Sequence, residues 1–166
     1  RYRLVFHCDH LKLSSLLQQL GIGNDQGEGR ISGSIPVMIS KDEIRFRDAF
    51  LYSTPGENGS IKMLANESIS AAAAASDQLS FALDALQDFD YSWVKLNLSS
   101  EKEMLRVALQ TDGKPVNRLY YIPKDGSLVK SEVANEFQGL NLNANLNIPL
   151  TNTLKTYKQM QKIFNP

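Results

Sequence analysis

The stretch LNLNANLNIPL, residues 140–150, alternates apolar side chains with asparagine from Leu140 to Ile148 without interruption. Because successive side chains of a β-strand point to opposite faces, this period of two predicts a strand with one apolar face and one amide face. Such a strand packs its apolar face on other apolar groups and keeps its polar face in water. The question of function is therefore what covers the apolar face, which is either the protein's own core or a ligand that the protein carries.

Other stretches of the chain show the same alternation and are expected to be strands of the same sheet. Pro36 has no backbone N–H to donate, so its strand is expected to lie at an edge or to be interrupted there. Asp48-Ala49 breaks the alternation of the next strand, which predicts a β-bulge. The expected strands are Arg1–Cys8, Arg30–Ser40, Glu43–Ser53, Ser60–Leu64, Asp88–Ser99, Met104–Thr111 and Glu136–Ile148. Lys41–Glu43 is the expected turn of the first hairpin, and residues 112–135 are the least regular segment.

Helices are predicted where apolar residues recur at helical spacing. Leu13–Leu20 has leucines at i, i+3, i+4 and i+7, and Gly21 is a natural end for it. Ser68–Gln87 contains a run of alanines, which favour helix. Ser76-Asp77 could cap a new start within this segment, which leaves one helix or two open. Thr151–Phe164 is the third helical segment. Strand hairpins separated by helices predict an α+β fold with a mostly antiparallel sheet that is buried on one face.

Length and composition restrict the class of protein. The 166 residues fit a single domain, 1–166. Lys plus Arg and Asp plus Glu are 18 each, so the chain lacks the basic surplus that is typical of nucleic-acid-binding domains. No apolar run approaches the ~18 residues of a membrane helix. Since the chain begins at Arg1 in the style of a strand, we expect it to be a piece of a longer protein.

Candidate chemistry is confined to His7-Cys8-Asp9-His10. In a strand His7 and Cys8 point to opposite faces, and no other His or Cys follows, so we expect neither a metal site nor a cysteine nucleophile. The glycine-rich segment 21–29 follows a helix and precedes a strand, which is the wrong context for a phosphate-binding loop. We therefore predict a protein that is not an enzyme and has no cofactor.

Several motifs, taken in order, resemble the C-terminal region of the YdbH-like family, part of the AsmA-like group of Gram-negative envelope proteins. The motifs are G-x-x-x-G-x-I-P-V at Gly29–Val37, the Pro55-Gly56 turn, AL-x-x-F-x-Y at Ala85–Tyr91 and L-x-L-N-x-N-L at Leu140–Leu146. The resemblance covers roughly Leu11 to Leu154, which is most of the chain. Asp48-Ala49 departs from the Gly-Gly pair that is common in the family at this place.

The resemblance implies a periplasmic domain of an inner-membrane-anchored protein, whose long sheet curls into an apolar trough that conducts phospholipid between the two membranes. The expected fold is thus a curved sheet of amphipathic strands with about three helices packed on one face or end. The family has no catalytic residues to carry over. The side chains that we expect to face lipid are Leu140, Leu142, Leu146, Ile148, Val94, Leu96, Leu98, Leu105, Val107 and Leu109.

Two functions from different classes remain open at this point. In the first, this chain is the C-terminal part of a lipid-conducting groove, and phospholipid is its ligand. In the second, it is a capping and docking module, whose helices plug the end of the groove and whose sheet edge binds another envelope protein, an outer-membrane partner, by strand addition.

Overall fold

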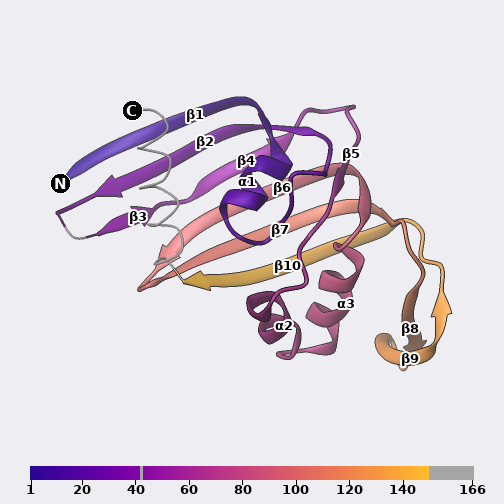
Figure 1. The fold of residues 1–166 in the computed structure, drawn as a ribbon. Helices are drawn as coiled ribbons and strands as arrows, with labels where there is room; N and C mark the ends of the chain where they lie inside the picture. The colour runs from indigo at the N-terminus through magenta and orange to yellow at the C-terminus, as the bar shows by residue number, and fades with distance from the viewer. Residues whose placement is uncertain (42, 150–166) are drawn as a thin grey trace.

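The computed structural model describes residues 1–41 and 43–149, which form a curved antiparallel sheet with three helices and a separate hairpin (Figure 1). Six strands make the continuous path of the sheet, in the order β1-β2-β4-β6-β7-β10. Their bounds are Tyr2–Lys12 for β1, Arg30–Ile39 for β2, Ala49–Ser53 for β4, Phe89–Glu101 for β6, Met104–Pro115 for β7 and Leu140–Pro149 for β10. The predicted α+β fold with a curved, mostly antiparallel sheet is confirmed.

Two short strands extend the sheet beside this path. β3 (Ile44–Phe46) pairs with β2, and β5 (Gly59–Ile61) pairs with β6. β3 and β4 are the two halves of the single strand predicted over Glu43–Ser53, and they are separated at Asp48, whose φ is 45°. The predicted irregularity is confirmed there. Of the predicted turn at Lys41–Glu43, Asp42 lies outside the described residues, as does the whole helix predicted over Thr151–Phe164.

Pro36 does not lie at the edge of the sheet, because β2 has a strand on either side of it. On one side Pro36 is opposite Val5 of β1, and on the other it faces the break between β3 and β4. There the backbone N–H of Arg47 donates to the carbonyl oxygen of Pro36 at 3.0 Å. The missing proline donor is thus accommodated by an interruption in the neighbouring strand rather than in β2 itself.

The strand β10 confirms the Leu/Asn alternation in full. It pairs with β7 from Leu140 opposite Gly113 to Pro149 opposite Met104 without a register shift. Its four asparagines are exposed, whereas its apolar residues from Leu142 to Ile148 are buried. A register slip of one residue would exchange the two sets, so burial on one face fixes the pairing.

The three helices pack their apolar side chains into the same core as the buried face of the sheet. They are α1 (Leu13–Gln19), α2 (Glu67–Ala73) and α3 (Asp77–Ala85). The segment predicted as one helix or two is two, because Ser76 ends the alanine run and starts α3. Its hydroxyl oxygen accepts a hydrogen bond from the backbone N–H of Leu79 at 3.1 Å, as an N-cap does. Asn66 caps α2 in the same way through Ile69.

The segment 112–135, predicted to be the least regular of the chain, is mostly β-strand, so this prediction is wrong. β7 continues to Pro115, and then β8 (Leu119–Lys124) and β9 (Ser127–Asn135) form a hairpin outside the main sheet. Asp125 and Gly126 connect the two strands with φ of 51° and 79°, the conformation that a two-residue hairpin turn requires at both positions. The Asp-Gly pair was the signal for this hairpin in the sequence.

One tyrosine anchors this hairpin to α3. The Tyr121 hydroxyl donates to Oδ2 of Asp84 at 2.6 Å and lies 2.8 Å from Oγ of Ser80. Its ring meets Phe81 edge to face, with the centroids 5.0 Å apart. Burial, and secondarily the hydrogen bond with Asp84, raises the pKa of Tyr121 to about 12. These contacts join β8 to the helical layer and hold the hairpin at that end of the molecule.

Candidate functional site: the apolar face of the sheet

One face of the main sheet is apolar across all six strands of its path. Side chains of directly paired residues lie on the same face of an antiparallel sheet, so the register traces this surface. One row runs from Leu51 of β4 through Leu96 and Leu109 to Ala144 of β10. A parallel row runs from Ala49 through Leu98 and Val107 to Leu146. We call this surface the apolar face.

The residues predicted to face lipid come together on the apolar face. All ten belong to β6, β7 and β10 and are neighbours in the register. Nine of them are buried, with at most 4% of the side chain exposed, and Leu140 is half-buried against the same core. The structure thus places the ten residues on one surface, and their contact with lipid stays a prediction.

Helices α2 and α3 lie against the β10 side of this surface (Figure 1), and their apolar residues belong to the same buried core. Phe81 and Leu83 of α3 and Ile69 of α2 are almost completely buried in this layer. At the other side Leu13 and Leu17 of α1 are buried where β1 ends. Full burial of each such side chain stabilises the fold by roughly 1.5–3 kcal/mol relative to exposure.

The apolar face is exposed at one end, which comprises the first half of β1, the last half of β2 and β3. Tyr2, Leu4 and Phe6 of β1 are 74%, 44% and 48% exposed. They are paired with Ile39, Val37 and Ile35 of β2, and Val37 is in turn paired with Phe46 of β3. We call this region the open end; its residues are Tyr2, Leu4, Phe6, Ile35, Ile39, Ile44 and Phe46.

The open end is continuous with the buried part of the apolar face. Val37 lies between Leu4 and Phe46 in the register and is only 5% exposed. Ile35 and Phe46 are half-buried and pack against the core. An apolar ligand that contacts Leu4 or Phe6 would therefore touch the same surface that elsewhere forms the core. The sequence predicted this strand and its apolar side, but it contained no signal that this end is exposed.

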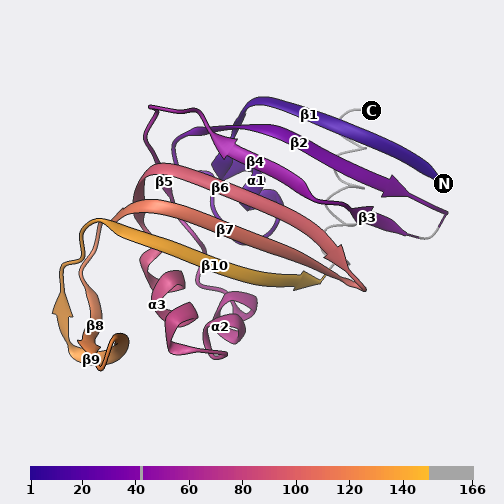
Figure 2. The same ribbon diagram turned by 180° about the vertical axis from the view of Figure 1, so that it is seen from behind.

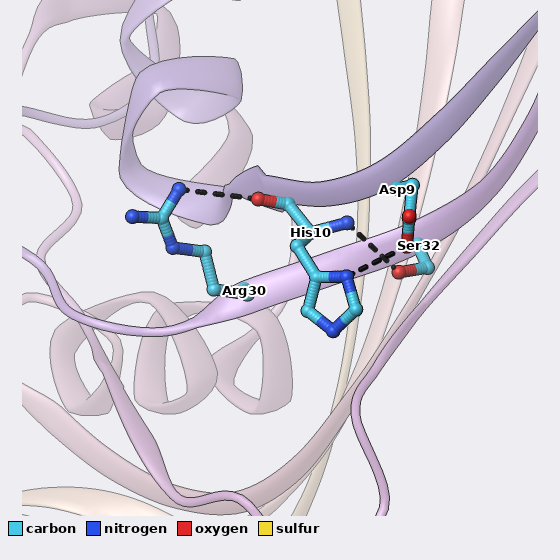
Figure 3. A network of polar contacts seen from close by, with 4 residues as sticks. All are labelled: Asp9, His10, Arg30 and Ser32. Carbon is cyan, nitrogen blue, oxygen red and sulfur yellow. Dashed lines mark hydrogen bonds and ion pairs between the residues drawn. The ribbon is translucent and has the colours of Figure 1, made fainter.

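The cluster His7-Cys8-Asp9-His10 forms a β-bulge at the end of β1 (Figure 3). Asp9 and His10 together are opposite Ser32, and His10 has a φ of 54°. The backbone N–H of His10 donates to the Ser32 hydroxyl at 3.1 Å, and Arg30 donates to the carbonyl oxygen of His10 at 3.1 Å. The bulge keeps both Cys8 and Leu11 on the apolar side, opposite Gly33 and Ile31.

The polar contacts of this cluster stabilise the bulge. Nδ1 of His10 lies 2.6 Å from a carboxylate oxygen of Asp9 in an exposed pair. Burial raises the pKa of the Cys8 thiol, which lowers its thiolate fraction and opposes a role as nucleophile. In residues 1–41 and 43–149 no three His, Cys, Asp or Glu side chains are grouped as a metal site would require.

The fold and the site together define a class of protein: a curved sheet of amphipathic strands whose apolar face is covered by helices at one end and exposed at the other. Across its described helices, none combines the length and the hydropathy needed to cross a membrane. The family model described as YdbH-like, intermembrane phospholipid transport protein YdbH, matches residues 2–151. The chain therefore belongs to the YdbH-like family, as its motifs predicted. This family name implies intermembrane phospholipid transport in general and suggests a protein of the cell envelope. No match was found among curated proteins or among solved structures.

Proposed function

We propose that the apolar face conducts phospholipid, with acyl chains lying on it and headgroups remaining in water. The observation that carries this proposal is the continuity of the open end with an apolar surface that spans six strands. Tyr2, Leu4 and Phe6 supply exposed apolar area at the point where a chain could first make contact. The ten residues predicted from the sequence lie further along the same surface, in β6, β7 and β10, where the helices cover them.

The mechanism that this surface supports is passive. Each methylene group that leaves water for an apolar surface contributes about 0.8 kcal/mol, so a whole acyl chain gains several kcal/mol without any chemical step. No cofactor and no catalytic side chain enters this mechanism. Over β6, β7 and β10 the helices occupy the place of a ligand, so we propose that α1–α3 close the groove here and that lipid in this domain contacts the open end first.

The place of this chain in a longer protein and in the cell is also a proposal. We infer that the chain is the C-terminal, periplasmic part of an inner-membrane-anchored envelope protein, in which further strands continue the groove. The support for this is the family and the amphipathic character of β6, β7 and β10.

A photocrosslinking experiment tests the lipid path with a matched control in the same strand. Phe6 and Val5 are neighbours in β1 and are 48% and 42% exposed, but they lie on opposite faces. The photoreactive analogue benzoylphenylalanine is placed at one or the other, and the protein is irradiated with phospholipid vesicles. We expect a lipid adduct by mass spectrometry at position 6 and little at position 5. Equal adducts at both positions, or none, would contradict the proposal.

A second function, docking of another envelope protein, is favoured by a difference between the two sheet edges. β1 carries Arg3, His7, Asp9 and the bulge at His10, which are features that discourage pairing with another strand. β10 carries no charged side chain, and in the described residues it pairs only with β7. We propose that a partner strand would add to β10. Crosslinking from Asn143 to a partner, without crosslinking from Arg3, would support docking at this edge.

A further inference from the structure

We propose that the face of the sheet opposite the apolar face binds a neutral carbohydrate chain. Figure 2 looks onto this side, with the strands in front of α1. Along β4, β6, β7 and β10 the side chains of this opposite face alternate with those of the apolar face. Most of them are exposed, whereas the side chains of the apolar face are buried. We call it the amide face; the residues that carry the proposal are Phe50, Tyr52, Asn97, Gln110, Asn143 and Asn145. This inference does not depend on lipid transport, which uses the other face.

Two exposed aromatic rings are the first observation. Phe50 and Tyr52 of β4 are 43% and 40% exposed, and their ring centroids are 5.8 Å apart with a tilt of 33°. Two neighbouring rings on an otherwise polar strand face form a small apolar patch, and a ligand that covers this patch gains free energy. The apolar C–H faces of a sugar ring stack on such rings, while its hydroxyl groups stay at the rim and bind polar neighbours.

Amide side chains beside these rings are the second observation. Phe50 is opposite Asn97, and this row continues through Ala108 to Asn145 of β10. Tyr52 begins the neighbouring row, which passes through Lys95 and Gln110 to Asn143. Each amide offers two N–H donors and a carbonyl acceptor, a combination that suits sugar hydroxyl groups, which both donate and accept.

The dimensions and the charge of the amide face favour an extended neutral ligand. Neighbouring strands are about 4.8 Å apart, so a row from β4 to β10 offers a new side chain at intervals close to the length of one pyranose unit. The one cation within these rows, Lys95, lies over the ring of Trp93 at 5.4 Å from its centroid and is thereby engaged. The rows on either side add one cation, Arg106, and one anion, Asp112, so this face has only a small positive surplus and gives little electrostatic advantage to nucleic acid or to an anionic lipid headgroup.

Trp93 makes the proposal directly measurable. It is the single tryptophan of the chain and is half-buried on the amide face, where it follows Tyr91 after a register shift in β6. Its fluorescence should therefore respond to a ligand on this face, whereas binding at the open end should leave it unchanged. The probes are the trisaccharides triacetylchitotriose and maltotriose, titrated into the whole chain.

We expect saturable quenching or enhancement with at least one of the two trisaccharides. The double substitution Phe50→Ala/Tyr52→Ala should weaken binding at least about tenfold, and Asn143→Ala about threefold. Tyr120→Ala is the matched control, since Tyr120 is a 60% exposed tyrosine of the β8–β9 hairpin and should leave binding unchanged. Circular dichroism should confirm that every variant is folded, as expected for exposed positions.

Three results would overturn the proposal. The first is the absence of a saturable change with either trisaccharide at millimolar concentration. The second is undiminished binding by the double variant. The third is a response of Trp93 to phospholipid vesicles but to neither sugar, which would assign the amide face to a membrane surface instead.

Discussion

The two ends of the apolar face are built from the same kind of strand but have opposite surroundings. At the covered end Leu98, Val107 and Leu146 are at most 2% exposed, whereas at the open end Tyr2 and Phe6 are about half exposed or more. At both ends apolar residues recur with a period of two on one side of the strand, although Val5 adds an apolar residue to the other side of β1. The difference teaches that the alternation fixes which side of a strand is apolar, while the placement of helices decides whether that side is core or surface.

The largest expected effect comes from placing a charge at the covered end. Val107→Asp would bury a carboxylate without a partner, because Val107 has no measurable exposure. The cost should be about 4 kcal/mol or more, which would unfold a domain of ordinary stability. Urea denaturation monitored by circular dichroism measures it. Leu4→Asp at the open end is the control and should change the free energy of unfolding by less than about 1 kcal/mol. Equal losses at both ends would remove the distinction between them.

A smaller loss is expected when the helical cover is weakened without adding charge. Leu83→Ala in α3 removes a side chain that is 1% exposed and leaves a cavity between the helix and the sheet. Such substitutions cost about 2–5 kcal/mol. The urea midpoint should fall accordingly, with the m-value unchanged. A loss below about 1 kcal/mol would mean that α3 is not an integral part of the covered end.

Tyr121, which anchors the β8–β9 hairpin, should contribute less to the free energy of unfolding than Leu83 does. Its contribution should also depend on pH. Tyr121→Phe removes the hydrogen bond to Asp84 and should cost roughly 1–3 kcal/mol at neutral pH. The pKa of Tyr121 is raised from 10.0 to about 12, so its neutral hydroxyl stabilises the fold fully below pH 10. That contribution is lost as the pH rises from 10 towards 12.

The pH profile of unfolding checks this linkage. Burial also raises the pKa of Tyr91 to about 12, so the Tyr121→Phe variant should lose stability in the same window with a shallower slope. Identical slopes for the wild type and the variant would show that Tyr121 does not contribute to the pH dependence.

The features that could be predicted from the sequence share one property: each depends on residues that are close together in the chain. The alternation of Leu140–Ile148 is a local signal, and this prediction is confirmed; the capping side chain of Ser76 is another local signal, and the structure selects the two-helix alternative that it offered. The Asp125-Gly126 turn is an equally local signal, but the strands that it joins lack the long apolar alternation that marks the strands of the main sheet. Exposure of the open end could not be predicted, because it depends on which strands the helices reach and not on any residue within β1.

The smallest effect on stability is expected at the open end, where a functional effect should be largest. Leu4→Ser replaces a side chain that is 44% exposed and should change the free energy of unfolding by about 0.5 kcal/mol or less. If the open end first receives acyl chains, the same substitution should reduce lipid binding. Thermal denaturation and a vesicle-binding assay on one sample measure both. A variant that loses stability but keeps lipid binding would reverse the expected pattern.

Native mass spectrometry of the purified chain is the most direct measurement of the central claim, which is that lipid lies on the exposed part of the apolar face. We predict that the wild-type protein carries at least one phospholipid. The double variant Leu4→Ser/Phe6→Ser should be folded but should carry little or none. A wild-type protein without bound phospholipid after exposure to vesicles, or a double variant that retains it fully, would contradict the account.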